Sequence, residues 1–271
     1  MQHRNRSALP HFAGLQDLVN DPDVKEIIVN NNTEVWAERT AGLERAGSLA
    51  PGEAAALLER LLAPIGRRID LSSPVVDARL SDGSRLCAAI PPVSPYGLCL
   101  TIRRFSTTTL GISSFANGRV TDLLHSVVHQ RRNIVIAGAT STGNTTLLSA
   151  LASEAPANER LVVLEDTNEL AVAHPHVVYL ESRPSSAEGM TEISLSHLVR
   201  HALRLRPDRL IVGEVRGPEA FDMLQAMNTG HAGSMSTCHA NSAHDALYRL
   251  ESMVLQATPN WPLPAVRSYI A

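Results

Sequence analysis

The sequence predicts an α/β domain over residues 118–271, preceded by a smaller α+β domain over residues 1–105 and a linker at 106–117. Two observations lead to this division. Hairpin signals separate short apolar runs in the first hundred residues, whereas apolar strands alternate with helical segments from about Asn117 onward. This alternation is typical of a parallel sheet with helices on both faces. With 271 residues, of which 44% are hydrophobic, the chain is long enough for two compact domains.

Turn and helix signals define the elements of the first domain. Asp82-Gly83 is a dipeptide that favours a tight hairpin, and Ala41-Gly42 marks a second turn. Pro51-Gly52 precedes a run rich in Ala, Leu and Glu, which indicates a helix over Glu53–Ile65. Ser106–Thr109 is rich in Ser and Thr and begins the linker. The expected strands are Val24–Asn30, Glu34–Arg39, Leu43–Ala46, Val76–Leu80, Arg85–Ile90 and Leu98–Phe105.

The second domain repeats strand, loop and helix. An apolar strand at Asn133–Ala137 leads into a glycine-containing turn, and a helix follows at Thr145–Ser153. The further expected strands, with helical segments between them, are Leu161–Leu164, Val177–Leu180, Leu210–Gly213 and Ser234–Cys238. Parallel α/β sheets bind ligands at the carboxyl ends of their strands. The residues at these strand ends are therefore the candidates for function.

The turn after the first of these strands resembles a phosphate-binding loop. Gly138, Gly143 and Thr145 are in register with the pattern Gly, four residues, Gly, Lys, Ser or Thr, but Asn144 replaces the lysine. In such a loop, backbone N–H groups and the helix N-terminus surround phosphates, and Thr145 would offer its hydroxyl to Mg²⁺. The alternative is an ordinary Gly/Thr-rich turn. The expected nucleotide contacts are Gly138, Thr140, Ser141, Thr142, Gly143, Asn144, Thr145 and Thr146.

Two glutamates, Glu165 and Glu214, each end an apolar strand of the second domain. The position of Glu214 is where a P-loop ATPase has the acidic residue that binds Mg²⁺ through water or orients the attacking water. Each glutamate has a structural alternative. Asp166 or Thr167 would serve as a helix N-cap, and Glu214 would form a surface ion pair with Arg216.

Two histidines, His231 and His239, lie eight residues apart in the segment Thr229–Asn241. A histidine at a strand end beside a phosphate site can sense or polarise the terminal phosphate. Metal binding is disfavoured because no third ligand lies nearby at a suitable spacing. A buried or capping histidine is the other alternative.

Composition excludes several classes of protein. The net charge of −3 gives no whole-chain case for a nucleic acid or an anionic membrane as partner. No apolar run approaches the roughly 18 residues of a membrane helix, and the polar N-terminus is no signal peptide, so we expect a soluble, cytoplasmic protein without a transmembrane segment. The three cysteines lack a C-x-x-C spacing, which argues against a disulfide framework. The single lysine, Lys25, is far from the phosphate loop in sequence.

Together these motifs resemble the type II/type IV secretion ATPase superfamily, and most closely the CpaF-like ATPases of tight-adherence (Flp) pilus assembly. Gly138–Thr146 looks like the Walker A loop of that family, and Leu161–Leu170 looks like its Asp box. Arg206–Gly217 resembles its atypical Walker B segment, and Thr229–Asn241 its His box. The resemblance covers nearly the whole chain, and Arg206–Asn241 is its most specific part.

The resemblance implies a RecA-like P-loop domain that binds and hydrolyses ATP with Mg²⁺ in a homo-hexameric ring. It also implies that Arg103 and Arg104 approach the nucleotide phosphates, with a solvated strand end as the alternative. The ring would work in the cytoplasm, peripherally at the inner membrane, on platform proteins of a secretion or pilus machine and without nucleic acid. The residues that the resemblance assigns to catalysis are Glu214, Glu165, His239 and His231.

The chain departs from this family at three places. Asn144 replaces the Walker A lysine, and Ala232 stands where an acidic residue is usual. Family members also continue past Val266–Ala271, so the second domain is expected to be incomplete at its C-terminus.

Two functions are therefore open. The first is an active motor ATPase of secretion or pilus assembly, and the second is a nucleotide-binding, non-hydrolysing ring subunit or a truncated remnant. Loss of one preorganised donor to the transition state typically costs about 10²–10³ in rate, so Asn144 favours the second, whereas the other motifs favour the first. A DNA-processing RecA-like ATPase needs a basic DNA-binding surface, which the negative net charge disfavours.

Overall fold

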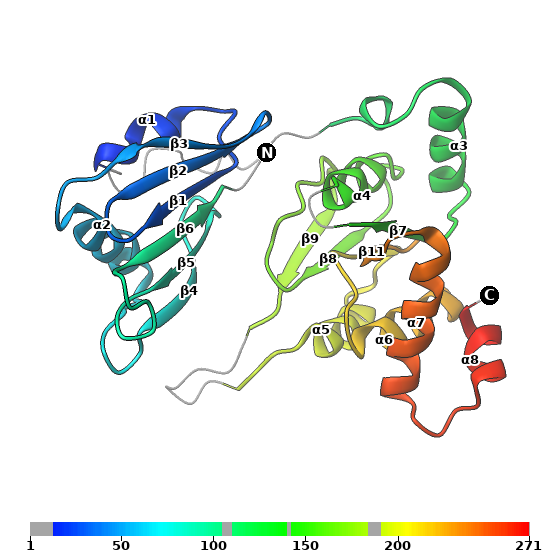
Figure 1. Cartoon of the computed structure of the whole chain (residues 1–271). Helices are drawn as coiled ribbons and strands as arrows, with labels where there is room; N and C mark the ends of the chain where they lie inside the picture. The colour runs from blue at the N-terminus through cyan, green and yellow to red at the C-terminus, as the bar shows by residue number, and fades with distance from the viewer. Residues whose placement is uncertain (1–12, 105–109, 140–141, 184–190, 271) are drawn as a thin grey trace. The chain divides into compact units, whose positions relative to one another are not determined.

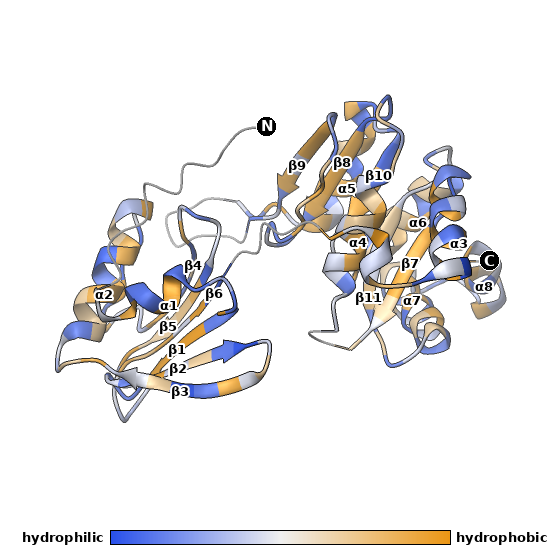
Figure 2. Cartoon of the chain, turned by 90° about the horizontal axis from the view of Figure 1, so that it is seen from above, coloured by the Kyte–Doolittle hydropathy of each residue, from blue (hydrophilic) through white to orange (hydrophobic). Residues whose placement is uncertain are grey.

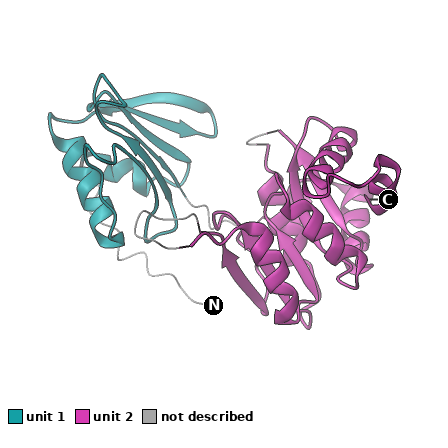
Figure 3. Cartoon of the chain, turned by 90° about the horizontal axis from the view of Figure 1, so that it is seen from below, with its two compact units in different colours: residues 1–106 teal, residues 107–271 magenta. Residues whose placement is uncertain are grey.

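The computed structural model describes residues 13–104, 110–139, 142–183 and 191–270. The chain forms two compact units, residues 1–106 and residues 107–271, which Figure 3 shows in different colours. Each unit has its own sheet and its own hydrophobic core.

The first unit contains a six-stranded antiparallel sheet with strand order β3-β2-β1-β6-β5-β4 (Figure 1). Each expected strand is present: Glu34–Arg39 has the predicted bounds, the other strands differ slightly, and Phe105 lies outside the described residues. The helix predicted from Glu53 ends in a 3₁₀ turn because Pro64 cannot continue it. The elements in chain order are η2 (Ala13–Leu15), α1 (Gln16–Asn20), β1 (Glu26–Asn30), β2 (Glu34–Arg39), β3 (Gly42–Ser48), α2 (Glu53–Leu62), η3 (Ala63–Ile65), β4 (Val75–Arg79), β5 (Arg85–Ala89) and β6 (Cys99–Arg103).

Helices α1 and α2 cover one face of this sheet. Alternate strand residues such as Ile27 and Val29 point into the core with the leucines of α2. The residues between them, such as Glu26 and Ile28, are half-buried and lie on the opposite face, because strand side chains alternate. That opposite face carries the charged side chains discussed below.

The second unit contains a five-stranded sheet with order β7-β11-β10-β8-β9, and every neighbouring pair is parallel. The α/β fold predicted for this part of the chain is confirmed. Its elements are η4 (Ile112–Ser114), α3 (Gly118–His129), β7 (Ile134–Gly138), α4 (Asn144–Ser153), β8 (Leu161–Glu165), β9 (Val177–Glu181), α5 (Leu195–Ala202), η5 (Leu203–Leu205), β10 (Arg209–Val212), α6 (Glu219–Asn228), β11 (Met235–His239), α7 (Ala243–Ala257) and α8 (Leu263–Ile270).

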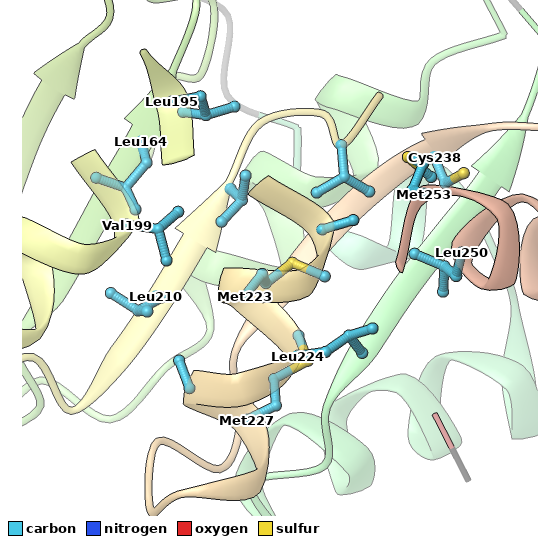
Figure 4. Close-up of a cluster of buried hydrophobic side chains, with 14 of the residues drawn as sticks. Leu164, Leu195, Val199, Leu210, Met223, Leu224, Met227, Cys238, Leu250 and Met253 are labelled. Atoms are coloured by element: carbon cyan, nitrogen blue, oxygen red, sulfur yellow. The ribbon is translucent and has the colours of Figure 1, made fainter. Parts of the chain in front are cut away.

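Helices cover both faces of the parallel sheet, with α4 on one side and α5, α6 and α7 on the other (Figure 1). Every residue of β8 is buried, and Figure 2 shows this strand as hydrophobic, in contrast to the mixed colours of the exposed β3. Leu164 and Leu210 pack with Val199 of α5 and Met223 of α6 in the larger cluster (Figure 4). The continuous apolar character of these strands follows from burial on both faces.

The connection between β8 and β9 differs from the prediction. Helical segments were expected between all strands of this domain, but residues 166–176 contain no helix. The expected alternative of a helix N-cap at Asp166 or Thr167 is therefore wrong. The segment is held by side chains instead, because Ser149 and Ser153 of α4 accept hydrogen bonds from the backbone N–H groups of Ala171 and Ala173.

A buried ion pair lies at the amino end of β10. Arg209, the first residue of β10, is fully buried, and its Nε donates to the carboxylate of Glu159. Arg131 approaches the same carboxylate with an Nε–Oε1 distance of 2.9 Å.

In the described part of the chain, no helix is long and apolar enough to cross a membrane.

Candidate nucleotide-binding site

The carboxyl ends of four strands bring most of the predicted site residues to one edge of the parallel sheet. Gly138 ends β7, His239 ends β11, Glu214 follows β10 and Glu165 ends β8. In the sheet order these strands are direct neighbours, so the residues follow one another along the edge in that sequence. Gly138 and His239 are paired in register.

The loop between β7 and α4 has the backbone features of a phosphate site. Gly143 precedes the first helical residue with φ +92°, a left-handed conformation that favours glycine. Among the described residues no side chain caps this end of α4, and the first N–H groups of a helix are the donors that an anion can bind. Thr140 and Ser141 lie outside the described residues.

Asn144 turns its side chain into the loop. Its Nδ2 donates to the carbonyl of Ala139 at 3.3 Å, and its Oδ1 accepts from the Thr142 hydroxyl at 3.4 Å. The single proton of this hydroxyl is shared with the nearer Ala139 carbonyl, at 2.7 Å. Gly138 makes this position of the Asn144 side chain possible, because a Cβ on residue 138 would lie 2.7 Å from Asn144 Nδ2 and 2.7 Å from Thr142 Oγ1.

The residues suit a nucleotide phosphate better than a metal held by protein alone. Thr145 and Thr146 lie half-buried in the first turn of α4. Among the described residues, no group of three His, Cys, Asp or Glu side chains could hold a metal ion. Mg²⁺ at this edge would therefore depend on the Thr145 hydroxyl, water and the phosphates, which is how Mg²⁺ is usually bound beside nucleotides.

Glu165 is buried and engaged with its own loop. Its Oε1 accepts hydrogen bonds from the backbone N–H groups of Glu169 and Leu170, each at 2.9 Å. Its other oxygen is buried with no partner among the described residues. Burial raises the pKa of this carboxyl to about 7, while the two backbone hydrogen bonds lower it. The carboxyl also packs against Gly213, where a Cβ would be 2.9 Å from the Glu165 Cγ.

Glu214 forms the ion pair that was the structural alternative for it. The Arg216 Nη2 donates to Glu214 Oε2 at 2.6 Å, and the Arg216 Nε lies 4.0 Å from Asp166 Oδ2. The Glu214 segment is tied to β11, because the Thr237 hydroxyl donates to the Gly213 carbonyl at 2.7 Å. This pairing leaves Glu214 half-buried at the site edge.

The two histidines lie at opposite ends of β11. His239 is its last residue, beside the phosphate loop, whereas His231 lies in the turn before it. The turn at His231 is fixed by a backbone hydrogen bond to Ala226, and Gly233 donates to the Asn133 side chain at 3.0 Å. Within this unit the structure therefore does not bring His231 together with the other site residues. The five-residue strand β11 rises about 3.3 Å per residue and separates the two histidines.

The two candidate arginines of the first unit, Arg103 and Arg104, have different surroundings. Arg104 donates from Nη1 to the backbone carbonyls of Asp21 and Val24, so it holds its own unit together. Arg103 is exposed on the open face of the sheet and is paired in register with Arg85, which in turn is paired with Arg79. Arg85 and Arg79 were missed, because only the pairing of β4, β5 and β6 reveals that the three arginines form a row.

The fold and the loop define the class: a RecA-like P-loop domain preceded by a smaller α+β unit. Residues 11–266 match the family described as Type II/IV secretion system protein, and the chain belongs to this family. The resemblance to the secretion ATPase superfamily is thereby confirmed at family level.

Curated relatives and a solved structure agree with this assignment. A putative conjugal transfer protein of Mycobacterium tuberculosis is 37% identical over 252 residues, which cover 88% of this chain and 72% of the relative. The type IV secretion system protein PtlH of Bordetella pertussis is 34% identical over 279 residues, covering 91% of this chain and 81% of the relative. The VirB11 ATPase of the Brucella suis type IV secretion system is 29% identical with a TM-score of 0.50, covering 96% of this chain and 85% of that chain.

The pilus retraction motor PilT supports the fold alone. It has a TM-score of 0.69 at 17% identity, and the match covers 97% of this chain and 75% of that chain. The architecture predicted for this chain is therefore one that solved secretion and pilus ATPases share.

Proposed function

We propose that this chain is a nucleotide-binding subunit of a secretion or pilus-assembly motor, and that Asn144 leaves it with little or no ATP hydrolysis. The observation that carries the proposal is the position of the Asn144 side chain, which turns into the loop and donates to the Ala139 carbonyl. Membership of the secretion family supports a role in a motor. The position of Asn144 in the loop supports nucleotide binding without turnover.

Nucleotide binding is supported by the backbone of the loop. Gly143 in its left-handed conformation and the uncapped N-terminus of α4 supply N–H donors that need no lysine. Thr145 lies in the first helical turn, and in this proposal its hydroxyl would bind Mg²⁺ together with the phosphates. We therefore expect MgATP and MgADP to bind with reduced affinity.

Loss of hydrolysis is supported by the chemistry of the substituted position. The Walker A lysine neutralises charge on the terminal phosphates, whereas asparagine is short and uncharged. Removal of one such donor costs roughly 10²–10³ in rate. The Asn144 amide is also committed to the Ala139 carbonyl inside the loop.

An active motor ATPase is the second candidate. The specific observation in its favour is that Glu214, Glu165 and His239 all lie at the sheet edge beside the loop. In this candidate Glu214 orients water or Mg²⁺ and His239 contacts the terminal phosphate. An arginine would then replace the missing charge.

The working assembly that we propose is a homo-hexamer in the cytoplasm, bound to platform proteins at the inner membrane without direct contact to nucleic acid. Its relatives include proteins of conjugal transfer and type IV secretion, and a CpaF-like role in Flp pilus assembly is the specific function that we propose. Arg103, whose side chain is exposed on its own sheet, is the arginine that we propose as a phosphate contact.

Calorimetric titration of the full chain with MgADP and MgATP tests binding, and phosphate release tests turnover. We expect binding that Thr145→Ala weakens, with phosphate release near the background rate. Absence of binding at millimolar nucleotide would contradict the proposal. Hydrolysis that Glu214→Gln abolishes would instead establish the active motor.

A further inference from the structure

Helix α5, with the 3₁₀ turn η5 that continues it, has one apolar face and one basic face. The apolar face is buried against the parallel sheet, where Val199 packs with Leu164 and Leu210 (Figure 4). The other face is exposed and carries four side chains that can hold a positive charge. These side chains, which we call the basic quartet, are His197, Arg200, His201 and Arg204.

The members of the basic quartet are neighbours on one surface. Each lies three or four residues from two of the others, and Cβ atoms at such spacings are about 5–6 Å apart on a helix. A cavity of about 250 Å³ lies over this face, and the described residues that line it are the four members of the quartet. The ends of these long side chains can therefore meet around one small ligand.

The quartet has little acidic compensation. Within the described part of the chain, only Arg200 of the four is close to a carboxylate, with its Nε 4.0 Å from Asp222 Oδ1. The other oxygen of that carboxylate accepts a hydrogen bond from the Ser196 hydroxyl, so Asp222 is shared. Like charges three or four residues apart destabilise a helix. The quartet thus carries a cost that the described acidic residues do not offset.

The helix dipole accounts for only part of this arrangement. Cations near the carboxyl end of a helix are stabilised by the dipole, which suits Arg200 and His201 in the last turn of α5. His197 is the third residue of the same helix, where a positive charge opposes the dipole. A favourable helix end therefore does not explain why the basic residues extend along the whole face.

We propose that the basic quartet binds a phosphate group of a ligand, at a site separate from the candidate nucleotide site. Guanidinium groups bind phosphate through paired N–H donors, and an imidazole N–H adds a further donor. A small cavity suits a compact anion better than an extended macromolecular surface. The phosphate group belongs either to a free phosphorylated molecule or to a lipid headgroup, which offer the same chemistry.

The position of α5 makes this site independent of the proposed function. Helix α5 covers the face of the parallel sheet opposite to α4, and the N-terminus of α4 is part of the candidate nucleotide site. Binding at the quartet therefore requires neither an intact phosphate loop nor MgATP.

An NMR titration of the full chain with inorganic phosphate tests the site locally. We expect the imidazole signals of His197 and His201 to shift with a common affinity. The signal of His129 should not respond, because this exposed histidine ends α3. An unchanged signal from both quartet histidines would overturn the proposal.

Substitutions of Arg204 test whether the quartet binds phosphate as a unit. Arg204→Gln should weaken the phosphate affinity at least about tenfold, because hydrogen bonds between charged groups are lost. Arg204→Lys keeps the charge without the paired N–H donors, so its affinity should lie between those of Arg204→Gln and the wild type. Arg267→Gln is the matched control, because it removes one exposed arginine from α8 with the same change in net charge. Equal weakening by Arg267→Gln would show a general charge effect and overturn the proposal.

Cosedimentation with vesicles identifies the source of the phosphate group. Vesicles of phosphatidylcholine alone are compared with vesicles of phosphatidylcholine and phosphatidylglycerol in equal parts, which carry anionic phosphate headgroups. Binding to the anionic vesicles only, weakened by Arg204→Gln, would assign a lipid headgroup to the quartet. A response to inorganic phosphate without vesicle binding would assign a free phosphorylated molecule.

The MgADP affinity separates this inference from the proposed function. Arg204→Gln should bind MgADP as tightly as the wild type, and a loss of MgADP affinity in this variant would overturn a separate site. If the wild-type chain binds no MgADP but its quartet histidines respond to phosphate, the proposed function fails and this inference stands. Binding of a single-stranded oligonucleotide that Arg204→Gln weakens, without any response to phosphate or vesicles, would assign the face to nucleic acid and overturn the inference.

Discussion

The Asn144 amide lies over Gly138, so that a Cβ on the glycine would be 2.7 Å from the Asn144 Nδ2. The two residues begin and end the same phosphate loop, and the amide fills space at its base. The loop is thus closed by neutral hydrogen bonds to the Ala139 carbonyl instead of presenting a cation. Under the proposed function, this arrangement would leave the loop able to bind phosphate but not to hydrolyse ATP.

Gly143→Ala should weaken MgADP binding strongly. Its left-handed φ of +92° disfavours any residue with a Cβ by about 1–2 kcal/mol, so the loop would shift and lose its aligned N–H groups. Gly230→Ala is the control, because Gly230 also has a left-handed φ of +112° with nothing within 4 Å. Calorimetry should show weaker binding for the first variant only, although both lose similar stability. Equal affinities in the two variants would contradict the phosphate loop.

Glu165 should make the folded chain less stable as pH rises. Its pKa is raised by burial from 4.5 to about 7, so between these values the folded state keeps a proton that the unfolded state has lost. At 1.36 kcal/mol per pKa unit, this carboxyl removes roughly 2–3 kcal/mol of stability between pH 5 and pH 8. Urea unfolding should show that Glu165→Gln gains stability relative to the wild type over this interval.

The exposed Glu181, opposite Glu165 in register, gives the matched control. Glu181→Gln should leave most of the pH dependence in place. If the unfolding free energy of Glu165→Gln follows that of the wild type at both pH 5 and pH 8, the pKa of the Glu165 carboxyl is not raised.

Glu159→Gln should destabilise the second unit by about 3–5 kcal/mol, because it leaves the guanidinium of Arg209 buried without its counter-ion. Thermal and urea unfolding measure this loss. The exposed pair provides the comparison, since Glu251→Gln removes the partner of Arg267 and should cost less than about 1 kcal/mol. Similar losses in both variants would show that burial of Arg209 does not govern the effect.

Local signals were enough to predict the elements that depend on turns and on continuous apolar runs. Asp82-Gly83 correctly marked the β4–β5 hairpin, and the strand–loop–helix pattern around Gly138 correctly predicted β7 and α4. The missing helix between β8 and β9 could not be predicted, because side chains of α4, distant in sequence, hold that segment. Tertiary hydrogen bonds there replace a local helix.

The contacts of the candidate site side chains could not be predicted from the sequence for a related reason. Arg103 and Arg104 look equivalent in sequence, yet strand alternation exposes the first and backbone carbonyls bind the second. Arg85 joins Arg103 through the register of β5 and β6, which no local pattern encodes. His231 and His239 belong to one motif, but β11 places them at opposite edges of the sheet.

The most direct measurement of the central claim is phosphate release by Asn144→Lys compared with the wild-type chain. Lysine would restore a mobile cation at the terminal phosphates, so we expect MgATP hydrolysis to rise by at least about 10²-fold. Asn144→Gln, which lengthens the side chain without charge, should leave the rate near background. Wild-type hydrolysis as fast as that of Asn144→Lys would contradict the account, because Asn144 would then impose no limit on turnover.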